Sequence, residues 1–519
     1  MNRVPGETLT RRTLFRTAGA GALVAALPSA APAAASSQDW PHLSWISPNT
    51  TADLPAPDAI VHLVNRITFG LLPADLERAR SLGFTGFVEE QLQPDSIDDA
   101  ETESAVAGMF PTLPLSPAAL FLREKSEVVR DLKGAALYRA VRSRRQLFEM
   151  MVDFWSNHFN VYHLDGQIAY LKTVDDREVV RPHAFGRFRD LLGASAKSPA
   201  MLLFLDNASN TKAGPNENYA RELMELHTLG VDGGYTQQDV QEVARAFTGW
   251  TVGRGAQKGT FVYAAKDHDD GARTVLGRSL PAGLGQGHGE RVLDILAGHP
   301  ATARHLAAKL CVRFVSDTPP AALVDAVAAA FSSSGGGLSG DVRATLRTLL
   351  LSSQFRAAVD QKLRRPFESV AATLRTLDAQ IGPEAIKPLL NTLRSMGQLP
   401  FDWPAPNGYP DANGAWGNTN GLLNRWNLGL TLGANRMPGV LTDLDALTGG
   451  LRRPTPATLV AALSARLLRR PLAAADRDRI VQHTAAGRPV DAPIPVAKVK
   501  ATTAGTVSLL LDSPYLQWR

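Results

Sequence analysis

Apolar residues recur at intervals of three and four along most of the chain, a spacing that predicts amphipathic helices. The stretches with this spacing are 57–70, 73–92, 118–162, 183–206, 216–230, 236–249, 289–330 and 341–355. We expect a break near Gly134 and a polar connector at 94–116. Residues 251–288 are rich in glycine, and we expect short strands at 260–263 and 273–276. The sequence therefore predicts a mainly α fold, a multi-helix array with a small β-hairpin insertion.

The predicted helix 216–230 has polar side chains at the border of its apolar face. His227 lies within the apolar arc, and Glu222 and Glu225, three positions apart, flank it. Burying such groups costs free energy unless they are hydrogen-bonded, paired or bound to a metal. We therefore take this helix as the centre of a functional site or of a structural polar network. Three more of its residues are candidates for orienting or binding a ligand, namely Asn216, Asn218 and Arg221.

A histidine also lies on the apolar face of the predicted helix that ends near residue 162. His158 is at the middle of that face, while Asp153 and Asn157 belong to the opposite polar stripe. Two inward-facing histidines, His158 and His227, could meet in one core. They would then act as metal ligands or proton carriers, or would be ordinary hydrogen-bonded core residues.

A metal site on the central helix is limited by helix geometry. On a straight α-helix, Glu222 and His227 lie about 140° apart, so both cannot bind one ion unless the helix bends. Glu222 and Glu225, joined by a histidine from elsewhere such as His158, form the better candidate for a divalent metal. A second candidate is the insertion tip at 266–271, whose His268 and Asp269 offer an imidazole and oxygens. Aspartate and glycine also form turns without any metal.

The segment 400–410 combines prolines, aromatic residues and Asn407. A long ordered loop of this kind in a helical protein is typically functional or covers the core. Aromatic, asparagine and aspartate side chains line carbohydrate sites, and they also simply pack together.

Charge and cysteine content exclude some classes of protein. The formal net charge is +5, but four arginines and one glutamate within residues 1–35 supply +3 of it. No basic run suggests nucleic-acid binding. Cys311 is the single cysteine, so no disulfide framework is expected. No stretch after the first segment reaches about 18 uninterrupted apolar residues, so we expect no membrane span in the mature chain.

Residues 1–35 have the pattern of a twin-arginine signal peptide, with Arg11 and Arg12 before a weakly apolar run and Ala33–Ala35 at the cleavage site. We expect export by the twin-arginine translocase to the periplasm or beyond. This route transports folded proteins, often loaded with a cofactor, and so favours a bound metal. The expected divisions are a leader at 36–56, a helical domain at 57–435, and a C-terminal helical segment at 436–519 that completes the same body.

Several motifs together resemble a known family: Phe154–His158 with Phe159, the run 215–230, Gly249–Trp250, His268–Asp269, Arg364–Phe367, and Asn407–Pro410, preceded by His62, Arg66 and Gly70. The chain is similar to the bacterial "domain of unknown function 1800" family over nearly all of its mature length. Ser156 and Tyr409 depart from the motifs, where a bulkier polar residue and a tryptophan are expected. The resemblance implies export and a helical architecture, and assigns no reaction. Members are often encoded beside a second exported family, "domain of unknown function 1501", similar to sulfatases and phosphatases, which implies a sulfatase-like partner.

Two functional hypotheses follow. The first is an exported enzyme, metal-dependent if its acids hold an ion, that acts on an envelope or extracellular polymer. Glu222 or Glu225 would be its general base or ligand, and Asp153 and Asn157 would orient His158 and His227. The second is a non-catalytic envelope scaffold or assembly partner, in which these residues fix helix register. The sequence contains no nucleophile elbow, P-loop or His-Glu-x-x-His motif, so it names no substrate or reaction.

Overall fold

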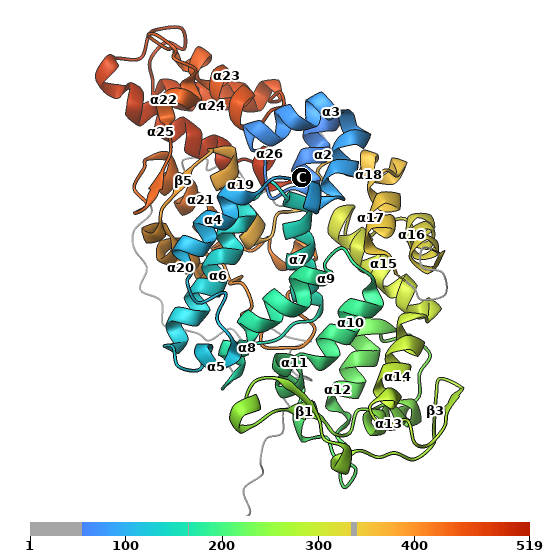
Figure 1. The fold of residues 1–519 in the computed structure, drawn as a ribbon. Helices are drawn as coiled ribbons and strands as arrows, with labels where there is room; N and C mark the ends of the chain where they lie inside the picture. Colours follow the sequence, from blue (N-terminus) through green and yellow to red (C-terminus); the bar gives the residue numbers. More distant parts are fainter. Residues whose placement is uncertain (1–53, 164–165, 334–339) are drawn as a thin grey trace, which may run out of the picture. The chain divides into compact units, whose positions relative to one another are not determined.

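Helices make up most of the computed structural model, which describes residues 54–163, 166–333 and 340–519 (Figure 1). The predicted signal peptide and nearly all of the predicted leader lie outside these residues. The mainly α prediction is confirmed. Every helix in the described ranges is too short or too polar to cross a membrane.

The first half of the described chain follows the predicted helices with three exceptions, one of which is a helical stretch at 168–182 that was not predicted. Its helices are α2 (Ala59–Ile67), α3 (Pro73–Gln91), α4 (Ala100–Met109), α5 (Pro117–Leu120), α6 (Lys125–Arg142), α7 (Gln146–His158), α8 (Ile168–Asp175), the π-helix η4 (Asp176–Val180), α9 (Arg181–His183), α10 (Phe188–Lys197), α11 (Pro199–Phe204), α12 (Glu217–Glu222), the π-helix η6 (Leu223–Thr228) and α13 (Gln237–Ala246). The expected connector at 94–116 contains α4. The expected break at Gly134 is wrong, because the chain breaks instead between α6 and α7.

Gly134 is explained by packing rather than by a break. A Cβ at this position would lie 2.6 Å from the Phe110 ring and 2.8 Å from Ile386. The glycine therefore allows α6 to approach two neighbours closely. The break comes at Ser143, whose hydroxyl donates to Asp99 and accepts from the amide of Arg145.

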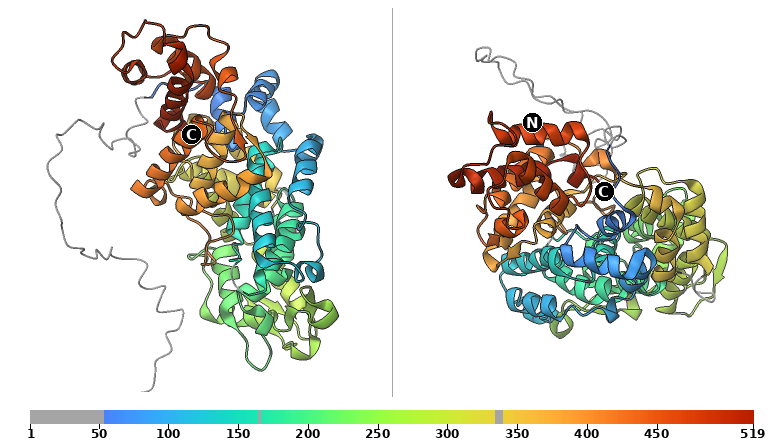
Figure 2. Two further views of the ribbon diagram at one scale, coloured as in Figure 1. Left: turned by 90° about the vertical axis from the view of Figure 1, so that its left-hand side faces the viewer. Right: turned by 90° about the horizontal axis from the view of Figure 1, so that it is seen from above.

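The second half is also helical. Its helices are α14 (Gly287–Ala297), α15 (Pro300–Phe314), α16 (Ala321–Ser333), α17 (Val342–Leu350), α18 (Ser353–Ala357), α19 (Pro366–Thr376), α20 (Ile386–Ser395), α21 (Thr419–Gly433), α22 (Leu444–Thr448), α23 (Pro456–Leu467), α24 (Ala474–Ala485), α25 (Val496–Leu511) and α26 (Pro514–Gln517). In both views of Figure 2, α22 to α25 lie together, and α25 also packs on α21. An isolated antiparallel bridge pairs Leu363 with Trp518, which joins the C-terminal residues to the start of α19.

The insertion contains two hairpins instead of the expected one. Strand β1 (Trp250–Val252) pairs with β2 (Phe261–Tyr263), and β3 (Arg273–Val275) pairs with β4 (Arg278–Leu280), both antiparallel. The strands expected at 260–263 and 273–276 exist, but they do not pair with each other. Leu276 and Gly277, both with positive φ, close a two-residue turn that returns the chain directly onto β3. A third small sheet pairs β5 (Gln380–Ile381) with β6 (Val440–Leu441).

Helix α7 lies at the centre of the buried core and presents functional groups on two sides. Its apolar side contributes Trp155 to aromatic contacts with Phe188 of α10. Its end, at His158, reaches η6 and α15, which pack against each other. Figure 1 shows α7 between α6 and α15, the arrangement that positions the site described next.

Candidate active site

Three histidines meet where the end of α7 faces η6 and α15. The ring centroid of His158 lies 6.0 Å from that of His227 and 6.4 Å from that of His305. His158 and His227 are both almost fully buried. The prediction that His158 and His227 face inward and meet in one core is confirmed, and His305 of α15 joins them.

Hydrogen bonds fix the tautomer of His158. Its Nε2 lies 3.1 Å from the carbonyl oxygen of His227, which can only accept, so Nε2 bears the proton. Its Nδ1 therefore has the free lone pair and accepts from Nζ of Lys309 at 2.9 Å. Burial, reinforced by Lys309, lowers the pKa of His158 well below its usual range. The ring is thus a neutral acceptor for Lys309.

The other two histidines are also neutral. Burial, with Lys309 as the next cause, lowers the pKa of His227 to about 3 and that of His305 to about 4. His305 Nε2 contacts the carbonyl oxygen of Leu226 at 3.2 Å, whereas Nε2 of His227 is buried with no hydrogen-bond partner. Nε2 of His227 is thus an unsatisfied polar atom in the same buried group as the charge of Lys309.

Lys309 is the amine that lies among these three histidines. Burial lowers its pKa to about 8, with Asp411 acting in the opposite direction. Within the described ranges, Lys309 forms no ion pair at 4 Å or less, and its short contact is to His158. A lysine with a pKa near neutrality exchanges its proton readily and can act as a general acid or base.

A cleft of about 430 Å³ opens beside these residues. His158, His305 and Lys309 line one side of it, and Arg313 and Arg365 extend the basic wall. The predicted loop also lines the cleft, with Trp403, Asn407, Gly408, Tyr409 and Pro410, as does Asp411, which lies 3.8 Å from Arg313 and 4.0 Å from Arg365. The cleft thus combines basic groups, aromatic rings and amides around one lysine.

Asn157 fastens the loop to α7. Its Nδ2 donates to the carbonyl oxygen of Tyr409 at 2.9 Å, and its Oδ1 accepts from the Tyr409 amide at 2.7 Å. One turn further on, Asn160 donates to the carbonyl oxygens of Trp403 and Ala405. The predicted polar stripe of α7 is therefore covered by the 400–410 loop, which it holds against the helix.

Asp153, from the same stripe, belongs to a buried ion network. Its carboxylate pairs with Arg365 at 2.5 Å and with Arg313 at 3.2 Å. Glu368, which is 1% exposed, pairs with both arginines and with Arg519. The three arginines hold the pKa of Glu368 well below its usual range despite burial. This network anchors the basic wall of the cleft.

Glu222 and Glu225 lie apart from the histidines. Both are half-buried, and burial followed by the charge of Glu225 raises the pKa of Glu222 to about 7. Glu225 accepts from the hydroxyl of Tyr235 at 3.5 Å. Among the described residues, the histidine and carboxylate atoms close enough to share an ion do not include these two acids. The two acids therefore form a separate carboxylate pair near the surface.

The remaining candidates on this helix stabilise its first turns. Asn216 accepts from the amide of Asn218 as N-cap, and Arg221 pairs with Glu217 at 2.9 Å. Asn218 contacts Asp206 at 3.4 Å.

The central helix is not a regular α-helix throughout. From Leu223 to Thr228 it is a π-helix, in which the amide of Leu229 donates to Met224, five residues earlier. The wider turn buries Thr228 fully and leaves Leu226, expected in the apolar arc, only partly buried. His227 remains in the core because its side chain is turned toward α7.

The two residues expected to bind metal at the insertion tip have different partners. Asp269 pairs with Arg245 at 2.7 Å, and this guanidinium lowers the Asp269 pKa to about 2. His268 is buried and contacts His288 of α14, at 3.1 Å. The neighbouring Asp270, not Asp269, faces these two rings.

Sequence reasoning missed His305, Lys309, Asp411 and His288. It included Asp270 only as part of the insertion tip at 266–271, and Arg365 only as part of a family motif. A signal was present for α15, where His305, Lys309 and Arg313 are spaced four apart and share one face. In a sequence alone, a basic stripe of this kind indicates a solvated helix face. Only the structure shows that a cleft lies beside it.

The comparisons agree with the resemblance of the motifs. No curated protein and no solved structure matches the chain significantly. The family model described as "Protein of unknown function (DUF1800)" matches residues 62–518. That range includes His62, the α7 motif, the central helix and the 400–410 loop. The chain therefore belongs to the DUF1800 family.

Proposed function

We propose that this protein is an exported enzyme that performs acid–base chemistry on an anionic envelope or extracellular polymer, at the cleft beside α15. The observation that carries the proposal is the Lys309–His158 pair, 2.9 Å apart, at the wall of an open cleft. The twin-arginine pattern at Arg11 and Arg12 supports export. In this proposal Lys309, and not Glu222 or Glu225, is the general base.

Lys309 is the proton-transferring group. Its pKa of about 8 leaves an appreciable neutral fraction near physiological pH, and the neutral amine takes a proton at Nζ. His158 accepts the hydrogen bond that orients this amine, and the His227 carbonyl holds His158 in the required tautomer. This order of reacting group, orienting ring and fixed acceptor is typical of catalytic sites.

The charge of the cleft favours an anionic substrate. Lys309 has no carboxylate partner of its own within the described ranges, whereas Arg365, which also lines the cleft, is paired with Asp153 and Glu368. The ammonium of Lys309 is therefore the cation open to a carboxylate, sulfate or phosphate group of a substrate. Trp403 supplies an aromatic face of the kind that stacks on sugar rings, supported from behind by the buried ring of Tyr409. An acidic polysaccharide combines both features.

The test is turnover of defined polymers by purified mature protein. The probes are a polyuronate and a sulfated polysaccharide, with neutral dextran for comparison. Reducing ends report hydrolysis, and ultraviolet absorbance of unsaturated sugars reports elimination. We expect Lys309→Met to lose at least 100-fold activity while circular dichroism stays unchanged, and Lys387→Met, an exposed lysine on α20, to retain it. Turnover that survives Lys309→Met, or no turnover of either anionic probe, contradicts the proposal.

A second candidate function is an envelope scaffold that assembles with a co-exported sulfatase-like protein. The observation that favours it is the bonding of polar side chains on α7 and just after it, where Asp153, Asn157 and Asn160 all bond to other elements. Such a network fixes helix register without chemistry. Under this alternative, Lys309→Met leaves every activity of the assembly unchanged, and Asn157→Ala weakens binding of the partner.

A further inference from the structure

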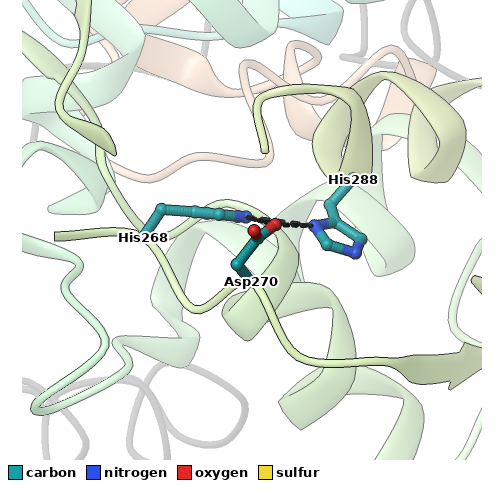
Figure 3. Close-up of side chains that lie close together, drawn as sticks. All are labelled: His268, Asp270 and His288. Atoms are coloured by element: carbon teal, nitrogen blue, oxygen red, sulfur yellow. Dashed lines mark hydrogen bonds and ion pairs between the residues drawn. The ribbon is translucent and has the colours of Figure 1, made fainter. Parts of the chain in front are cut away.

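One cluster of metal-binding side chains lies outside the cleft. Among the described residues, His268, Asp270 and His288 form the single group of three whose ligand atoms all lie within 4.8 Å of one another. Figure 3 shows the three side chains pointing toward a common centre. His268 Nε2 is 3.1 Å from His288 Nδ1, and Asp270 Oδ1 is 4.0 Å and 3.6 Å from these two nitrogens. None of the three residues lines the cleft.

The backbone fixes the tautomers of both rings. His268 Nδ1 lies 2.8 Å from the carbonyl oxygen of Thr248, and His288 Nε2 lies 2.9 Å from that of Pro281. A carbonyl oxygen only accepts, so each of these nitrogens bears the proton of its ring. The hydroxyl of Thr248 donates to Arg245, which leaves it too as an acceptor toward His268.

With these tautomers, the atoms that the two rings and Asp270 direct toward one another are all hydrogen-bond acceptors. In their neutral forms, His268 Nε2 and His288 Nδ1 both present lone pairs, and they face each other at 3.1 Å. The carboxylate of Asp270 adds a third acceptor, held in place by the amide of Gly285 at 2.9 Å. Three lone-pair groups converge at one point only when a cation lies between them, either a metal ion or a proton.

We propose that His268, Asp270 and His288 bind a divalent transition-metal ion, with Zn²⁺ the ion that fits best. Two imidazole nitrogens on a tetrahedral Zn²⁺ lie about 3.3 Å apart, since each Zn–N bond is about 2.0–2.1 Å. The observed spacing of 3.1 Å is close to this value. Imidazole ligands select such ions over Mg²⁺ and Ca²⁺, which prefer oxygen ligands.

The surroundings match those of metal-binding histidines. Ligand histidines almost always donate their second ring proton to a carbonyl or carboxylate, and both rings do so here. His268 and His288 are buried, whereas Asp270 is exposed and can close the remaining distance. Three protein ligands on one side and solvent on the other leave a fourth position open, as in metal sites that bind water or substrate.

The proposed ion also links separate elements. His268 follows β2 in the insertion, and His288 begins α14 of the helical body. The site therefore closes the insertion onto α14, while Thr248 connects it to the end of α13. Binding is expected to stabilise the folded chain by mass action.

The experiment uses full mature protein, purified without affinity metal and treated with chelator. Calorimetric titration with ZnCl₂ is expected to give one ion per chain with micromolar or tighter affinity. Asp270→Asn and His288→Gln are expected to weaken this binding at least 10-fold. Asp267→Asn, in the same loop but outside the cluster, is the matched control and is expected to bind as the wild type does.

Two further readouts keep the proposal independent of catalysis. Co²⁺ bound in place of Zn²⁺ is expected to give the visible absorption of a low-coordinate site in the wild type and not in Asp270→Asn. Added Zn²⁺ is expected to raise the melting temperature of the wild type and not that of Asp270→Asn. Equal affinity of Asp270→Asn and Asp267→Asn for Zn²⁺ overturns the proposal. So does a ring proton shared between His268 and His288, seen by nitrogen NMR, that stays in place when Zn²⁺ is added.

Discussion

The ammonium group of Lys309 lies 2.9 Å from Nδ1 of His158, so a titrating lysine on α15 is fixed to a ring on α7 whose tautomer is set by the His227 carbonyl. This contact joins two helices that are distant in sequence at the wall of the cleft. The protonation of Lys309 should therefore affect the stability of the fold as well as the proposed chemistry.

Lys309→Met is expected to stabilise the protein at neutral pH. Burial lowers the pKa of Lys309 from 10.5 to about 8, so the unfolded chain binds the extra proton between these pH values. The wild type therefore gains stability as pH rises from about 8 to 10.5. We expect the variant to be about 1–2 kcal/mol more stable at pH 7, after allowance for partial exposure, and the difference to shrink by pH 10. Urea unfolding measures this, and a difference independent of pH would contradict the lowered pKa.

Glu222→Gln is expected to stabilise the protein above neutral pH. Burial and Glu225 raise the pKa of Glu222 to about 7, so the folded chain holds a proton that the unfolded chain has lost between about pH 4.5 and 7. Stability then falls as pH rises through this range. The variant should gain about 1–2 kcal/mol at pH 8 and nothing at pH 4.5.

The same variant tests the carboxylate pair as a metal site. A bound divalent ion would favour the charged form of Glu222, and Glu222→Gln would then lose stability at pH 8 instead of gaining it. Glu225→Gln is the companion variant, and is expected to lower the Glu222 pKa, as followed by carbon NMR of the carboxyl group.

Asn157→Ala is expected to release the 400–410 loop. The side chain makes two hydrogen bonds to the Tyr409 backbone, and their loss should cost about 2–3 kcal/mol. Limited proteolysis read by mass spectrometry should show faster cleavage within the loop. Asn420→Ala, which removes two exposed hydrogen bonds, to Ser395 and from Asn424, is the control and should leave cleavage unchanged.

Gly408→Ala probes the same contact from the loop side. Gly408 has a φ of +72°, and an added Cβ would lie 2.2 Å from the Asn157 carbonyl oxygen. Strain and overlap together should exceed the effect of Asn157→Ala. Equal stability of Gly408→Ala and the wild type would show that the loop does not need this close approach.

Glu368→Gln is expected to be the most destabilising of these variants. The carboxylate pairs with Arg313, Arg365 and Arg519. Removing its charge leaves Arg519 without a carboxylate partner among the described residues, and leaves Arg313 and Arg365 with Asp153 and Asp411 alone. We expect a loss of about 3–5 kcal/mol by urea unfolding. Glu90→Gln removes a surface ion pair with Arg78 and should change stability by less than about 1 kcal/mol.

The sequence pattern predicted burial better than it predicted partners. Helical spacing placed His158 and His227 inside, and the polar stripe of α7 was identified with Asp153 and Asn157 on it. Nothing in the local pattern says that a loop more than 240 residues later, at Tyr409, covers that stripe. Contacts of this length depend on tertiary packing.

The errors have the same physical origin. Gly134 suggested a break because glycine is a poor helix former, but Phe110 and Ile386 require the small residue there. Asp269 and Asp270 are adjacent and chemically identical, and only the course of the loop sends one to Arg245 and the other toward His288. Lys309 escaped notice because a basic helix face is normally solvated.

The π-helix at Leu223–Thr228 has a consequence for comparing members of the family. A helical segment whose hydrogen bonds span five residues contains one residue more than an α-helical segment with the same number of turns. The surplus residue behaves as an insertion within the family motif. A relative with a regular α-helix at this point would align to this chain only with a one-residue gap, and roles transferred across it without that gap would be assigned one position away from His227.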